Sequence, residues 1–112
     1  HVSNEDLRNE LIKSKERGEL TSEAVDMFIL MAKKFSLKFN YEYEEDRQDC
    51  IAQAIMDCYQ YWRGYDPNKS ENAFAYITQV IKNGMAKAWR KLHGNMPLSK
   101  KISIEKNNIY NI

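Results

Sequence analysis

Apolar residues recur every three or four positions in four separate stretches of the chain, and this spacing limits the possible folds more than any other feature of the sequence. It places the apolar side chains on one face of an α-helix, which must then pack against other helices. Polar or glycine-containing segments separate the stretches. The sequence therefore predicts an all-α protein, a compact bundle of four helices over residues 3–17, 22–39, 45–62 and 70–91.

Capping signals mark several ends of these expected helices. Ser3 followed by Asp6 is a Ser-x-x-acid signal for a helix start, and Gly18 is typical of a helix end. Either Ser70 or Asn72 is suited to cap the fourth helix. The side chains expected to face the core are Leu7, Leu11, Val25, Phe28, Ile29, Ala32, Phe35, Ile51, Ala54, Ile55, Cys58, Trp62, Phe74, Ile77, Val80, Ile81, Gly84, Met85 and Ala88.

The length of 112 residues fits one helical domain, which we expect over residues 1–96, followed by a short basic C-terminal tail over residues 97–112. Cys50 and Cys58 lie eight positions apart on the inward face of a helix, about 12 Å from each other, which is too far for a disulfide. Reduced thiols, no export signal and no apolar run of membrane length predict a cytoplasmic protein.

No pattern typical of catalysis or metal binding occurs in the chain. There is no Cys-x-x-Cys pair, no nucleophile–base spacing, and His93 is the only histidine besides His1. A solvated linker explains the acids between residues 42 and 49 better than a magnesium site does, because no phosphate-binding loop accompanies them. We therefore expect no enzyme activity, no cofactor and no bound metal.

The charges are distributed unevenly, although the net charge is only +1. Residues 1–71 contain ten Lys or Arg against fifteen Asp or Glu, whereas residues 72–112 contain seven against Glu105 alone. The basic part fits a polyanion, and the acidic part fits a basic protein partner or simply keeps the chain soluble. The same division arises by accident in some proteins, so charge alone does not decide the function.

The polar face of the fourth helix contains a tyrosine, amides and cations. With about 100° per residue, these side chains fall in a band about 80° wide, nearly opposite the expected core. A tyrosine stacks on an unpaired base, amides hydrogen-bond to base edges, and cations neutralise phosphate. A solvated face with its tyrosine over a neighbouring loop explains the residues equally well. The band consists of Asn72, Tyr76, Gln79, Asn83, Lys87 and Arg90.

The outward stripe of the third helix contains one apolar residue, Met56, among Asp46, Asp49, Gln53 and Gln60. An apolar centre with a polar rim is typical of a protein interface. A single exposed methionine is also common on ordinary surfaces, so both interpretations stay open at this point.

Residues 49–92 resemble the second conserved region of bacterial sigma factors. A helix that begins with an acid leads into the aromatic turn "YDPNKS", and the next helix carries Phe74, Tyr76, Thr78, Ile81 and Lys82 before a basic end. With the first two helices, the resemblance extends over most of residues 3–92. The short form and the acidic linker are most similar to the late-gene sigma factors of T-even-type bacteriophages.

The resemblance implies a sigma factor that binds the core RNA polymerase of a bacterial host and directs it to an A·T-rich minus-ten promoter element. In that family the third helix docks on the clamp coiled coil of the largest polymerase subunit, and the fourth helix reads and melts promoter DNA. The implied polymerase-binding residues are Asp49, Gln53, Met56 and Gln60, and the implied DNA-binding residues are Asn72, Tyr76, Gln79, Lys82, Asn83, Lys87 and Arg90.

The sequence departs from the family at the residues that melt DNA. Primary sigma factors carry a tryptophan pair where this chain has Gln79 and Val80. This suits an easily melted promoter or help from a phage co-activator, and a sliding clamp is a further partner of such late factors. Two alternatives are a helical adaptor or inhibitor that binds RNA polymerase without reading DNA, and a generic nucleic-acid-binding domain. The fourth-helix stripe discriminates between them, because a reader of DNA needs Tyr76 exposed with cations behind it, whereas an inhibitor does not.

Overall fold

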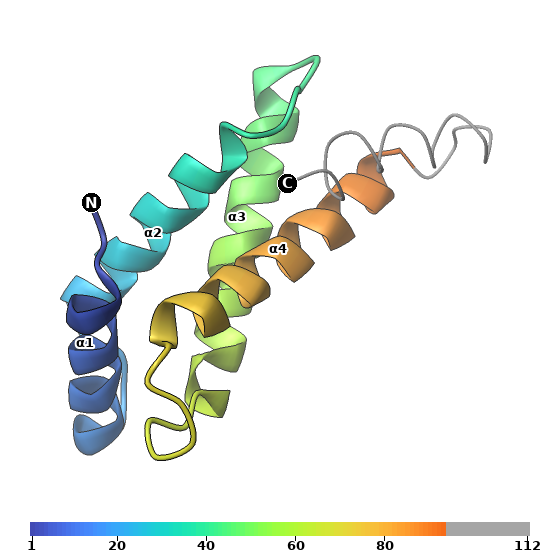
Figure 1. Cartoon of the computed structure of the whole chain (residues 1–112). Helices are drawn as coiled ribbons and strands as arrows, with labels where there is room; N and C mark the ends of the chain where they lie inside the picture. Colours follow the sequence, from blue (N-terminus) through green and yellow to red (C-terminus); the bar gives the residue numbers. More distant parts are fainter. Residues whose placement is uncertain (94–112) are drawn as a thin grey trace.

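A computed structural model describes residues 1–93 and confirms the all-α prediction (Figure 1). Within this range the chain forms four α-helices and no strand. The predicted domain boundary after residue 96 and the tail over residues 97–112 lie outside the described residues. The helices are α1 (Asn4–Arg17), α2 (Ser22–Ser36), α3 (Glu44–Tyr61) and α4 (Ala73–Leu92), and the short 3-10 turn η1 (Trp62–Gly64) follows α3.

Local side-chain chemistry sets the helix ends, as predicted at three of them. The Ser3 hydroxyl accepts a hydrogen bond from the Asp6 backbone N–H at 3.1 Å and caps α1. Gly18 ends that helix with a left-handed φ of 83°, which glycine adopts without steric cost. Asn72 caps α4 by accepting from the Ala75 N–H at 2.9 Å. The choice that the sequence left open between residues 70 and 72 therefore falls on Asn72.

Helix α2 ends at Ser36, three residues before the predicted end, because the chain turns back toward the core. Phe39 is buried, and its ring meets that of Phe35 edge-on at 5.4 Å between centroids. The Arg47 guanidinium donates a hydrogen bond to the Ser36 carbonyl at 3.0 Å and so satisfies a carbonyl of the last turn.

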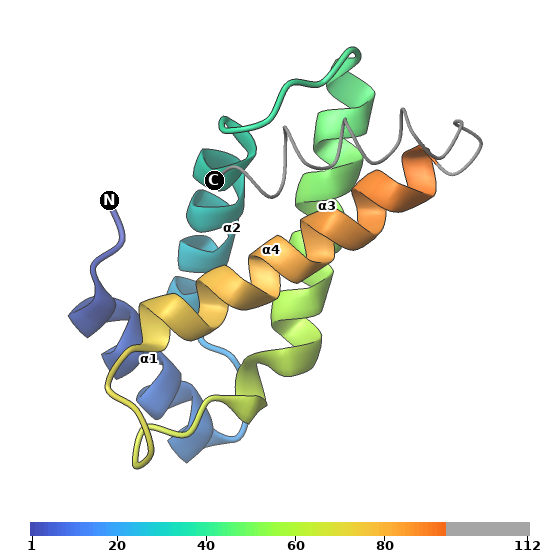
Figure 2. The same ribbon diagram turned by 45° about the vertical axis from the view of Figure 1, so that its right-hand side comes forward.

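The core lies where α4 crosses α3, with α2 and α1 packed beside this pair (Figure 2). Gly84 is buried at the crossing, and a Cβ placed there would lie 3.0 Å from the Ala54 Cα. The two helix backbones therefore approach closely at this point. Most of the predicted inward residues are buried, including Leu7, Leu11, Phe28, Ala32, Ile51, Ala54, Cys58, Trp62, Ile77, Val80, Ile81, Gly84, Met85 and Ala88.

Five predicted core residues lie at or outside the edge of the core. On α2 the buried face keeps Phe28 and Ala32 of the predicted stripe but is shifted toward Ala24 and Met31, because α1 and α3 cover that side. Phe74 was predicted to be buried but is 38% exposed, because its side of α4 lines an open groove next to α2. The other four are half-buried: Val25, Ile29, Phe35 and Ile55.

Both cysteines are buried and free, as the spacing predicted. Burial raises the pKa of the Cys58 thiol to about 12, and the nearby Asp57 carboxylate contributes to the increase. Burial likewise raises the pKa of Cys50 above its ordinary value. Neither thiol is ionised near neutral pH, so neither has the character of a reactive or metal-binding cysteine.

Within residues 1–93, no helix combines the length and the apolar character that crossing a membrane requires.

Candidate functional site

The turn between α3 and α4 is fixed by its own side chains. Tyr65 is only 2% exposed, and its hydroxyl donates to the Ser70 carbonyl at 2.7 Å. The Asp66 carboxylate accepts from the Asn68 N–H at 2.9 Å, which is the usual geometry of an Asx turn. These bonds span the "YDPNKS" segment and set the angle at which α4 leaves α3.

Helix α1 ties both ends of this turn to the rest of the fold. At one end, the Asn4 side-chain amide donates to the Glu71 carbonyl at 3.0 Å, and its oxygen accepts from the Phe74 N–H at 2.9 Å. At the other end, the Lys15 ammonium donates to the Arg63 carbonyl at 2.8 Å, while the Arg63 guanidinium donates to the Gly18 carbonyl at 2.7 Å. Hydrogen bonds from α1 and its C-terminal end therefore hold the α3–α4 turn in place.

The surface of α4 is basic, because its 20 residues contain four cations and no acid. Arg90 and Lys91 lie in the last turn, where positive charge also stabilises the helix through its macrodipole. Both are exposed, as are Gln79 and Asn83 in the middle of the helix. This surface offers amide donors and acceptors followed by cations.

Tyr76 does not lie opposite the core, and this part of the prediction was wrong. The residue is half-buried, its ring centroid lies 5.8 Å from that of Tyr65, and its hydroxyl donates to the Tyr61 carbonyl at 2.7 Å. The ring packs across the end of α3, where Gly64 has no Cβ to obstruct the hydroxyl. One part of the ring remains accessible, but the tyrosine is also a structural link between α3 and α4.

Burial raises the pKa of the Tyr76 phenol above its ordinary value, and the Cys58 thiol contributes to the shift. The phenol is therefore neutral near pH 7 and keeps the proton that it donates to the Tyr61 carbonyl.

Lys87, a cation of the same band, is exposed as predicted, with 56% of its side chain accessible, and it also forms an ion pair with α3. Its ammonium lies 3.2 Å from a carboxylate oxygen of Asp57, which is buried on α3. The Gln53 amide donates to the same carboxylate at 2.8 Å. Because an unpaired buried carboxylate is costly, this lysine has a structural role in addition to any contact with a ligand.

The position of the band explains why Tyr76 and Lys87 both contact α3. Tyr76 and Lys87 fall at about 260° and 280° around α4 and lie directly beside the buried Val80 at about 300°. Helix α3 covers this flank, because it approaches closely at Gly84. Only the far part of the predicted band, near 200° to 240°, faces away from α3.

The remaining predicted DNA-binding residues lie on the accessible part of α4. Gln79 donates to Asn83 at 2.8 Å, so the two exposed amides form one polar pair along the helix. Lys82 is half-buried, and Arg90 is exposed. The side chain of Asn72 is exposed but is used as the N-cap, so its oxygen already accepts a hydrogen bond.

The predicted polymerase-binding stripe on α3 is exposed around a central methionine. Met56 is 63% exposed, and Asp49 and Gln60 flank it as exposed polar residues. Gln53 differs from this pattern, since it is half-buried and bound to Asp57.

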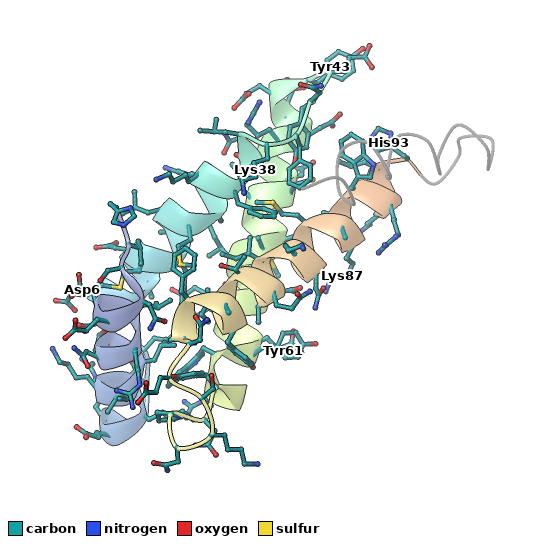
Figure 3. The ribbon with its side chains drawn as sticks, viewed as in Figure 1. Asp6, Lys38, Tyr43, Tyr61, Lys87 and His93 are labelled. Atoms are coloured by element: carbon teal, nitrogen blue, oxygen red, sulfur yellow. The ribbon has the colours of Figure 1, made fainter. Side chains whose placement is uncertain are left out.

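Two exposed aromatic residues beside this surface were not assigned to it from the sequence. Tyr59 and Tyr61 are 52% and 47% exposed, whereas Trp62 and Tyr65 of the same aromatic segment are buried. Figure 3 shows Tyr61 and Lys87 projecting on the same side of the molecule. The signal was present, because residues on either side of an inward position such as Trp62 point away from the core of a helix.

In residues 1–93, no three His, Cys, Asp or Glu side chains are grouped to hold a metal ion. A scan against protein-family models finds no match to this chain, and searches of curated proteins and of solved structures find none either.

Proposed function

We propose that this chain is a phage-type sigma factor, which binds the core RNA polymerase of a bacterial host in its cytoplasm and directs it to an A·T-rich minus-ten element. The proposal rests on the sequence resemblance over residues 49–92 and on one feature of the fold. A braced pair of helices presents an exposed Met56 among polar residues on α3 and an acid-free basic surface on α4. A factor that bridges polymerase and DNA needs two such surfaces at a fixed angle.

In this proposal α3 binds the clamp coiled coil of the largest polymerase subunit, with Met56 at the centre of the contact. Helix α4 then meets the DNA, where Arg90 and Lys82 approach phosphates and the Gln79–Asn83 pair meets base edges. The accessible part of the Tyr76 ring stacks on an unpaired base. The chain carries out no reaction of its own, because the polymerase supplies the chemistry.

The direct test is a pull-down with purified bacterial core polymerase, followed by transcription in vitro from promoters that contain only a minus-ten element. We expect binding to core polymerase and transcripts that depend on the A·T-rich element. A control promoter with G·C pairs in place of that element should give no transcript. Absence of polymerase binding would contradict the proposal.

The Met56 surface gives a more specific prediction. Met56→Asp should weaken binding to core polymerase by on the order of 2 kcal/mol, or about thirtyfold, because it places a charge at the centre of the contact. The side chain is exposed, so the thermal unfolding midpoint should stay close to that of the parent. Leu37→Asp, on an exposed residue of another face, is the matched control and should bind polymerase normally. Equal affinity of both variants would exclude α3 from the interface.

The basic surface predicts a difference between two cations. Arg90→Ala should lower promoter affinity of the assembled holoenzyme and reduce the salt dependence, d log K/d log [salt], by about one unit. Lys87→Ala should reduce it by less, because the Lys87 ammonium is already paired with Asp57, and should instead lower the unfolding midpoint. Fluorescence anisotropy of labelled promoter DNA over a range of salt concentrations measures both slopes. An unchanged slope for Arg90→Ala would show that this end of α4 does not meet phosphate.

A second candidate is a helical protein that binds RNA polymerase and blocks it without reading DNA. The specific observation in its favour is that Tyr76 and Lys87, two central members of the predicted DNA face, each already bond to a group of α3. Transcription with a host sigma factor present separates the two functions. A blocking protein lowers host transcription and gives no transcript from minus-ten promoters, whereas a sigma factor produces new transcripts.

A further inference from the structure

An apolar groove lies on the other flank of the molecule, between α2, the N-terminal segment and the start of α4. Its volume is about 510 Å³. Leu37 is 73% exposed, Leu30 is 54% exposed and Phe74 is 38% exposed, so large apolar side chains are left in water. The side chains that form its floor and walls are Leu30, Met31, Phe35, Leu37, Phe74 and Ile81. Several exposed apolar residues around one hollow are typical of a binding surface rather than of scattered surface positions.

Three lysines, Lys33, Lys34 and Lys38, line the same groove, and no acid does. None of the three forms an ion pair with another residue of the described part of the chain. By contrast, Lys13, Arg47 and Lys87 each have a carboxylate partner. Lys38 lies with its ammonium 5.3 Å from the Phe35 ring centroid, which places positive charge directly over the apolar surface.

The groove is separate from the surfaces assigned above. Phe74 and Thr78 fall at about 60° and 100° around α4, whereas Gln79, Asn83 and Arg90 fall at about 200° to 240°. Lys82, at about 140°, borders the groove. Figure 3 shows Lys38 near the end of α2, across α4 from Lys87 and Tyr61. Whatever occupies the groove therefore leaves Gln79, Asn83 and Arg90 uncovered.

We propose that the groove binds an acidic, amphipathic helical segment of a partner protein. The apolar side of that helix fills the groove and covers Leu30, Leu37 and Phe74, as amphipathic helices do in other hydrophobic grooves. Its carboxylates meet Lys33, Lys34 and Lys38, so charge complementarity selects the partner and sets its register. This interaction is independent of the proposed promoter function and of its polymerase contact on α3.

Other kinds of ligand fit the groove less well. The phosphates of a nucleic acid strand would pair with the three lysines, but the strand has no apolar side chains to fill the hollow. A membrane surface is bound by a projecting apolar face, whereas these residues line a concavity. The C-terminal segment of the chain is itself basic, with Lys100, Lys101 and Lys106, so it lacks the complementary charge.

The test uses the full chain and a synthetic peptide of about 18 residues, which has Leu and Phe at helical positions i, i+4 and i+7 and Glu at the flanking positions. We expect saturable binding by calorimetry, and about tenfold or greater weakening by the triple variant Lys33→Glu, Lys34→Glu, Lys38→Glu. A peptide with Lys in place of each Glu should fail on the parent and bind the triple variant. Such a reversal of peptide preference depends on the charges of the three lysines and not on the stability of the fold. Circular dichroism must show that each variant is folded.

A second variant tests the apolar floor without changing any charge. Phe74→Ala should weaken the acidic peptide by about tenfold, since it removes a ring from the wall of the groove. Failure of the acidic peptide to bind the parent would overturn the proposal. So would stronger binding to anionic phospholipid vesicles or to single-stranded DNA than to the peptide. Self-association of the parent that the triple variant abolishes would assign the groove to a second copy and overturn it as well. None of these results depends on whether the chain binds RNA polymerase.

Discussion

Replacing Gly84 with Val is expected to destabilise the fold by about 3 kcal/mol or more. A Cβ at this position would lie 2.9 Å from a carboxylate oxygen of Asp57 and 3.0 Å from the Ala54 Cα. The carboxylate can shift, but only at the expense of its bond to Gln53 and its ion pair with Lys87. The Cα belongs to the backbone of α3, so the two central helices would have to separate. The unfolding midpoint should fall by roughly 10–20 °C.

Asn83→Val is the matched control, because it introduces the same β-branched residue at the neighbouring, exposed position of the same helix. Asparagine and valine have similar helix propensities, so this variant should stay within about 0.5 kcal/mol of the parent. Calorimetry or thermal circular dichroism of both variants measures the difference. If Gly84→Val were as stable as Asn83→Val, α3 and α4 would not approach each other at Gly84 as the structure describes.

The sequence predicts those parts of the fold that depend on local chemistry. Ser3 and Gly18 are read from the sequence because capping bonds reach only a few residues along the chain. The burial of Gly84 also follows from helical spacing. The close approach at Gly84 does not, since it depends on which helix packs there. The end of α2 was placed three residues too late for the same reason, because Phe39 and Arg47 act on it through contacts across a turn.

The sequence predicted which residue types make up the surface of α4, but it did not predict which of those side chains are accessible. The absence of acids from α4 is a property of sequence and is found in the structure unchanged. The exposure of each side chain depends on the width of the covered face, which a helical wheel does not give. Tyr76 and Lys87 border the core at Val80, and both bond to groups of α3. Residues at such a border pack against the neighbouring helix and are also partly accessible, whereas a sequence pattern assigns each residue either to the core or to the surface.

Tyr76→Ala is expected to reduce open promoter complexes by about 1–3 kcal/mol, or roughly 5- to 150-fold, if the proposed function is correct. The accessible part of the ring then stacks on an unpaired base, and no tryptophan pair stands beside it to compensate. The variant also loses the contact with Tyr65 and the hydrogen bond to the Tyr61 carbonyl, so we expect about 2 kcal/mol of lost stability. Promoter opening must therefore be measured well below the unfolding midpoint of the variant.

Two further variants separate stacking from structure. Tyr76→Phe keeps the ring but loses the bond to Tyr61, so it should lose about 1 kcal/mol of stability and still open the promoter. Phe74→Ala removes an aromatic ring of the same helix on the opposite flank and should also open it. Permanganate reactivity of thymines near the start site measures the open complex, and a pre-melted template should restore transcription by Tyr76→Ala. If folded Tyr76→Ala opened duplex promoters as well as the parent does, the ring would serve only to join α3 to α4, and base stacking would have to be assigned to another residue, with the exposed Tyr61 nearest to it.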